Sequence, residues 1–111
     1  MTINEFQREC LRTARTDLPS DKLLLNGILG IGGEAGECVD YLKKHLFQGH
    51  ELDPETMISE LGDLSWYIAV TAYSLGYDLE QVFIKNKTKL RARYPDGFKA
   101  DLSIHRKEGD I

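Results

Sequence analysis

The chain has 111 residues, 41% of them hydrophobic and 29% charged, and its formal net charge is −4. These values are typical of one soluble globular domain with a single modest core, and the negative balance disfavours a broad nucleic-acid-binding surface. No apolar run reaches the roughly 18 residues of a membrane span, and the N-terminus has no signal-peptide core. Cys10 and Cys38 are too few for a disulfide framework. We therefore expect a cytoplasmic protein with neither a membrane nor a stable nucleic-acid partner.

The first half of the chain predicts two helices. The first begins at a capping box, in which Thr2 is followed three residues later by Glu5, and it stops before Pro19. The second spans about residues 20–48, and Gly49 directly after it is a typical C-terminal cap. No segment in this half shows the alternation of apolar and polar residues that a strand requires.

Two further helices follow. The third opens at Asp53-Pro54, a cap residue followed by proline at the first helical position, and it ends near Gly76. The fourth spans about residues 78–93 and is followed by the turn signal Y-P-D-G at 94–97.

These elements predict an all-α chain. Residues 1–97 form one domain, and residues 98–111 form a polar C-terminal tail with a few apolar residues. Because the linker between the second and third helices is short, those two helices should pack as an antiparallel hairpin. The expected fold is an oligomeric four-helix bundle with this hairpin at its centre.

Two acidic pairs, Glu34-x-x-Glu37 and Glu60-x-x-Asp63, are the most informative feature of the sequence. Positions three apart lie side by side on a helix. In an antiparallel hairpin, residues whose numbers have the same sum lie at the same height, so Glu34 should face Asp63 and Glu37 should face Glu60. Four such carboxylates repel one another unless a cation or protons intervene. All-oxygen ligands favour Mg²⁺ or Mn²⁺.

Glycines surround the first acidic pair, although either pair alone would be an ordinary solvated acidic face. Each glycine inside a helix costs up to about 1 kcal/mol relative to alanine, so close packing, a kink or a ligand must require the thin backbone. The glycines of this helix are Gly27, Gly30, Gly32, Gly33 and Gly36.

Helical periodicity predicts which faces are buried. The expected core stripe of the second helix is Leu24, Ile28, Ile31, Ala35, Cys38, Leu42 and Leu46, and that of the third is Met57, Leu61, Leu64, Ile68, Ala72 and Leu75. The third helix has a second apolar strip, formed by Trp66, Ala69, Val70 and Tyr73. A small monomer cannot easily cover both faces of one helix, so this strip predicts an oligomer interface.

Four other residues are candidates for substrate binding. On the fourth helix, Asn86 interrupts an inward apolar row, and a buried amide needs a partner. Lys89 and Arg93 follow near the same edge and would suit phosphate or base recognition. Tyr67 lies one turn beyond Asp63 and could stack on a base or support a carboxylate.

Three segments carry a family resemblance: G-E-A-G-E-C at 33–38, E-L-G-D at 60–63 and N-K-T-K-L-R-A-R-Y-P at 86–95. Together they closely resemble the MazG-like nucleotide pyrophosphohydrolases of the all-α NTP pyrophosphatase superfamily. The similarity covers nearly the whole chain from the first helix to Phe98, and no acidic position of the family motif departs from it.

The resemblance implies hydrolysis of a nucleoside triphosphate to the monophosphate and pyrophosphate. By analogy, the catalytic residues that hold one or more Mg²⁺ ions are Glu34, Glu37, Glu60 and Asp63. Asn86 and Lys89 match positions that contact nucleotide in relatives. Family members are dimers or tetramers, so a homodimer or homotetramer is expected.

Two other interpretations remain open. The chain could be a non-catalytic helical oligomer that binds metal or nucleotide as a regulator, or a structural bundle whose acids are simply solvated. The favoured hypothesis is a Mg²⁺-dependent nucleotide pyrophosphohydrolase, with the preferred base and sugar left open.

Overall fold

The computed structural model describes residues 1–111 as five helices joined by turns and short loops. The helices are α1 (Ile3–Leu11), α2 (Ser20–Gln48), α3 (Pro54–Ser74), α4 (Leu79–Arg93) and α5 (Ala100–Ile104). The chain divides into two compact units, Met1–Leu79 and Glu80–Ile111. The predicted all-α class is confirmed, but there are five helices instead of four, because α5 forms within the segment expected to be a tail. None of the helices combines the length and apolar character that crossing a bilayer requires.

Local signals set the start of α1, the start of α3 and the end of α2 where the sequence predicted them, whereas α1 ends at Leu11, well before Pro19. The Thr2 side chain accepts from the Glu5 backbone N–H at 3.1 Å, and Glu5 accepts from the Thr2 N–H in return, so the predicted capping box is confirmed. The Asp53 carboxylate accepts from the Glu55 N–H at 3.1 Å and caps α3. Gly49 ends α2 with φ of 75°, a left-handed conformation that glycine adopts without a steric cost.

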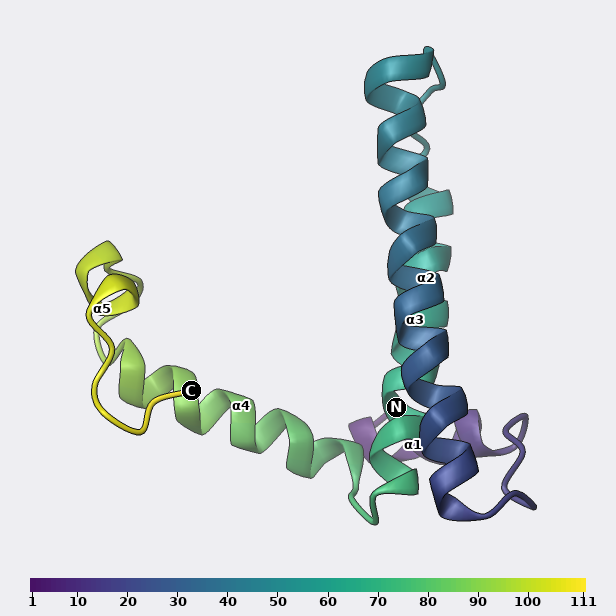
Figure 1. Ribbon diagram of the computed structural model, residues 1–111, viewed down its shortest axis with the longest axis horizontal. Helices are drawn as coiled ribbons and strands as arrows, with labels where there is room; N and C mark the ends of the chain where they lie inside the picture. The colour runs from purple at the N-terminus through teal and green to yellow at the C-terminus, as the bar shows by residue number, and fades with distance from the viewer. The chain divides into compact units, whose positions relative to one another are not determined.

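The predicted antiparallel hairpin is confirmed, with α2 and α3 packed closely along their lengths (Figure 1). Gly27 lies against Thr71, and Gly30 lies against the Tyr67 ring, so residue numbers fall on one helix as they rise on the other. A methyl group at either glycine would collide with these neighbours. The thin backbone of α2 is therefore required for close helix packing at these two positions.

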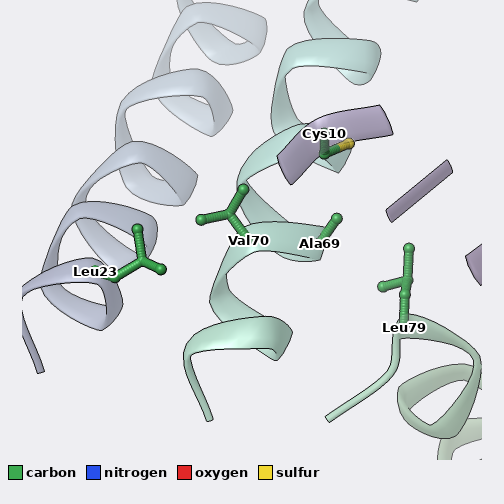
Figure 2. Close-up of a cluster of buried hydrophobic side chains, with 5 residues drawn as sticks. All are labelled: Cys10, Leu23, Ala69, Val70 and Leu79. Atoms are coloured by element: carbon green, nitrogen blue, oxygen red, sulfur yellow. The ribbon is translucent and has the colours of Figure 1, made fainter. Parts of the chain in front are cut away.

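A small buried cluster closes the end of the hairpin where α1 packs on α3. Its members are Cys10 from α1, Leu23 from α2, Ala69 and Val70 from α3, and Leu79 at the start of α4. Figure 2 shows Val70 directed toward the side of α2 that carries Leu23, and Ala69 directed toward Leu79 and Cys10. Because Ala69 and Val70 have no exposed surface at all, this cluster is the core of the first unit.

Gln7 connects the elements around this core through three hydrogen bonds. Its Nε2 donates to the carbonyl oxygens of Ala69 and Tyr77, both at 3.1 Å, and its Oε1 accepts from the Leu79 N–H at 3.1 Å. The side chain is buried. A buried backbone group that loses its partner costs about 1–3 kcal/mol, so this one amide fixes where α1 sits relative to the end of α3.

The predicted division of apolar faces is confirmed for Ala72 and Ile68 of α3, which are buried or packed against the core, but it was wrong at other positions of both long helices. The strip of α3 expected to form an oligomer interface contributes Ala69 and Val70 to the core, because α1 covers it. Conversely, the expected core stripes are partly open: Ile28 is 52% exposed and Leu61 50%. The face of α2 that meets α3 carries Gly27, Gly30 and Glu34 instead.

Candidate functional site

Three of the four predicted acids come together where α2 meets α3. Glu34 projects from α2, Glu60 and Asp63 project from α3, and one carboxylate oxygen from each lies within 4.8 Å of the others. Glu34 and Glu60 are half-buried, and Asp63 is exposed. Ligand distances of about 2.1 Å place the oxygens around Mg²⁺ roughly 3–4 Å apart. The three side chains could therefore hold one hard divalent cation after a small closing movement.

Electrostatic repulsion distinguishes Glu34 within this acidic cluster of Glu34, Glu60 and Asp63. Partial burial raises the pKa of Glu34, and the negative charges of Asp63, Glu60 and Glu37 raise it further. The close approach of the Glu60 carboxyl group acts in the same direction, because two carboxylates at this distance disfavour the ionised form of one of them. A cation bound by the cluster would offset the repulsive part of this shift, which adds to the effect of burial.

Glu37 does not join the cluster, although its position on α2 is the predicted one. Its side chain is exposed, and its charge acts on Glu34 from one helical turn away. Glu60, predicted to face Glu37, lies beside Glu34 instead, with carboxylate oxygens of the two within 4.8 Å of each other. The structure thus brings together Glu34, Glu60 and Asp63 and leaves Glu37 at the edge of the group.

The raised pKa of Glu34 predicts that metal binding strengthens as pH rises. A carboxyl group whose folded pKa lies above its unfolded value stabilises the metal-free fold at low pH and loses that contribution as pH rises through the folded pKa. A cation needs the ionised form, so it must displace the proton. We expect the Mg²⁺-induced rise in melting temperature to be small at pH 5 and larger at pH 7.5. In the Glu34→Gln variant the rise should be small at both pH values. An equal rise at both pH values in the unmodified chain would contradict this prediction.

Tyr67 lies in the same helix interface, one turn from Asp63. Its half-buried ring packs against Gly30 and meets the Trp66 ring edge-on, with 4.8 Å between centroids and an interplanar angle of 83°. The Tyr67 ring thus lies near the acidic cluster, and its contacts with Gly30 and Trp66 hold it in place. Stacking of this ring on a nucleotide base stays a prediction.

The predicted substrate-binding residues of α4 belong to the second unit and separate into two groups. Asn86 is exposed, so the expectation of a buried amide was wrong, and it lines a shallow hollow together with Leu90 and Tyr94. Lys89 and Arg93 line a different cavity, beside the segment that follows α5.

Two residues of the second unit that lie at this cavity, Lys85 and Asp110, were not among the predicted site residues. Lys85 lines the same cavity as Lys89 and Arg93, and its spacing of four residues from Lys89 was a usable signal. Asp110 pairs with Arg93 through two hydrogen bonds of 2.8 and 2.7 Å. Arg93 and Asp110 are 17 positions apart, and Asp110 lies in an irregular segment. No local sequence pattern therefore predicts that they pair.

Comparison with known proteins agrees with the motifs around these sites. The profile of the MazG nucleotide pyrophosphohydrolase domain matches residues 24–98, which include all four predicted acids and all of α4. The chain is 34% identical over 73 residues to the Gene 37 protein of Mycobacterium phage L5, a match that covers 62% of this chain and 64% of that protein. The chain thus spans slightly less than two thirds of this relative. No solved structure gave a significant match. Since the domain profile matches well over half of the residues, the chain belongs to the MazG nucleotide pyrophosphohydrolase family.

Proposed function

We propose that the protein hydrolyses a nucleoside or deoxynucleoside triphosphate to the monophosphate and pyrophosphate, with Mg²⁺ as cofactor. The observation that carries this proposal is the convergence of Glu34, Glu60 and Asp63 within 4.8 Å across the α2–α3 hairpin of a MazG-family chain. Carboxylate oxygens are the ligands that a hard cation prefers. The pKa of Glu34 is raised partly by the neighbouring negative charges, which a bound cation would balance. Mn²⁺ would suit the same oxygens.

In this proposal Glu34, Glu60 and Asp63 hold the cation, and Glu37 completes the set of four acids. The bound ion would neutralise the charge that develops on the departing pyrophosphate. A carboxylate that the ion does not engage accepts the proton of the attacking water. Asn86, Lys89, Arg93 and Tyr67 are the proposed contacts to the substrate, the two cations for phosphate oxygens and the tyrosine ring for the base.

A substrate panel tests the proposal directly. Purified protein is incubated with Mg²⁺ and each common NTP and dNTP, and pyrophosphate and monophosphate are quantified together. Release of both products in equal amounts from at least one nucleotide is the expected result. If calorimetry detects tight nucleotide binding but no nucleotide is turned over, the chain acts as a regulator and the enzymatic proposal fails.

We also propose that the chain forms a homodimer or homotetramer through the hairpin. Large apolar side chains remain exposed along α2 and α3, namely Leu25, Ile28, Leu29, Val39, Leu42, Leu46, Phe47, Ile58 and Leu61. Monomeric soluble proteins rarely leave so many large apolar side chains exposed on neighbouring elements.

Sedimentation tests this proposal and should give a multiple of the 12.6 kDa chain mass. Leu29→Glu should lower that mass without loss of helical circular dichroism, because Leu29 is 66% exposed in the single chain. A sedimenting mass of one chain for the unmodified protein would contradict the proposal.

A further inference from the structure

The pair formed by Arg93 and Asp110 is unusually sheltered for an ion pair of the second unit. Arg93 donates from Nε to Oδ2 of Asp110 at 2.8 Å and from Nη2 to Oδ1 at 2.7 Å. Only 9% of the arginine side chain and 17% of the aspartate side chain are exposed. The other ion pairs of the chain have side chains at least 41% exposed. Arg93 therefore holds a carboxylate in a two-bonded geometry that arginine also uses for phosphate.

Beside this pair lies a cavity of about 570 Å³. Lys85, Lys89 and Arg93 line it from α4, and their spacing of four residues places them in one row along the helix. The opposite side is formed by residues of the segment 105–111, which turns back beside α4 (Figure 1). A volume of this size suits a small ligand, and a row of three cations suits a chain of negative groups.

Asp110 is the anion that now occupies one end of this row. Its carboxyl pKa lies below the usual value, first because Arg93 donates to it, and then because the charges of Arg93, Arg106 and Lys89 attract the ionised form. Arg93 also donates to the Ile111 carbonyl at 3.4 Å, so three hydrogen bonds join this one side chain of α4 to segment 105–111. Arg93 thus ties the segment to α4.

We propose that residues 105–111 form a displaceable strap, in which Asp110 occupies Arg93 until a phosphate chain takes the place of its carboxylate. The inference rests on the proposed function, since the phosphate chain is taken to be that of the substrate. Arg93 is almost fully covered, so a phosphate cannot make two bonds to it while Asp110 remains. A phosphate chain carries several charges and can reach Lys89 and Lys85 as well, which a single carboxylate cannot do. Binding of the phosphate chain to Arg93 and release of residues 105–111 from Arg93 are therefore two sides of one exchange.

Calorimetry with inorganic tripolyphosphate tests this exchange without turnover. Titrations are carried out in EDTA at low salt with the full chain, so absence of hydrolytic activity would not affect the result. Asp110→Asn should bind tripolyphosphate on the order of tenfold more tightly than the unmodified chain, because the competing carboxylate is gone. Asp96→Asn removes the same charge from an exposed turn of the same unit and should change the affinity less than about twofold. Equal affinities of the unmodified chain and Asp110→Asn would overturn the proposal.

A second measurement uses the unmodified chain and so does not depend on how the variant folds. In NMR spectra the Arg93 Nε–H signal should shift on titration with tripolyphosphate, while the Asp110 amide, which donates to the Lys107 carbonyl at 3.1 Å, moves toward its random-coil position. A Mg²⁺-free nucleoside triphosphate should produce the same two changes, since the phosphate chain is the recognised group. If tripolyphosphate binds but the Asp110 amide stays in place, the strap is a fixed structural element and the proposal is wrong.

Discussion

Replacement of Asp63 by asparagine is expected to abolish pyrophosphate release while the hairpin stays folded. The substitution keeps the size of the side chain but removes one of the three carboxylates that converge within 4.8 Å. A neutral amide is a poorer ligand for Mg²⁺, and metal-assisted charge stabilisation is worth several kcal/mol. Activity should therefore fall by roughly 10³-fold. Quantified pyrophosphate from the best nucleotide of the substrate panel measures the loss.

The stability of the same variant separates a metal site from a structural cluster. Asp63 is one source of the repulsion that raises the pKa of Glu34, so its neutralisation should leave the melting temperature without metal unchanged or higher. The Mg²⁺-induced rise in melting temperature should disappear, because a ligand stabilises only the fold that binds it. A variant that melts well below the parent without metal would indicate that Asp63 supports the fold instead.

Asp21→Asn provides the matched control. Asp21 is an exposed carboxylate in the first turn of α2, 13 positions and about 20 Å along the helix from Glu34. Its loss changes the net charge by the same amount and should cost at most about 1 kcal/mol, through the helix dipole. Activity and the Mg²⁺ response should both remain. If both substitutions reduce activity equally, general charge, not the cluster, is responsible.

Three helix ends could be predicted from the sequence because the signals that set them are local. Thr2 and Glu5 satisfy each other within one turn, Asp53 caps the helix that begins at the next residue, and Gly49 supplies the left-handed conformation that ends α2. The hairpin register could also be predicted, since a short linker allows few alternatives. These signals predicted that Glu34 faces Asp63, and the two carboxylates do meet, but they also paired Glu60 with Glu37, which lies outside the acidic cluster.

What could not be predicted depends on contacts between segments distant in the chain. Helical periodicity showed two apolar strips on α3 but could not show that α1 would cover the one containing Ala69 and Val70. Gln7 gave no signal, because its three partners lie 62 to 72 positions away. Arg93 was recognised as a cation for phosphate, but its engagement by Asp110 depends on an irregular segment that no periodicity describes.

Replacement of an α2 glycine by alanine is expected to change the stability of the fold strongly, and the position of the glycine decides whether stability falls or rises. Gly27 is buried, and a methyl group there would meet the side chain of Thr71 and lie 3.3 Å from its Cα. Because that atom belongs to the α3 backbone, no side-chain rotation can relieve the contact, and the two helices must separate. Gly27→Ala should therefore destabilise the fold by about 1–3 kcal/mol, as overpacking commonly does. Thermal unfolding without metal measures this loss.

Gly32→Ala is the matched control within the same helix. Gly32 is exposed, and a methyl group there would meet nothing within 4 Å, so alanine should stabilise the fold by up to about 1 kcal/mol through its higher helix propensity. The two substitutions add the same atom to the same helix and should shift the melting temperature in opposite directions. A shift in the same direction for both would show that helix propensity, not the contact with α3, decides the outcome. Separation of the helices in Gly27→Ala should also move Glu34 away from Asp63, so this variant alone should need a higher Mg²⁺ concentration for the same thermal shift.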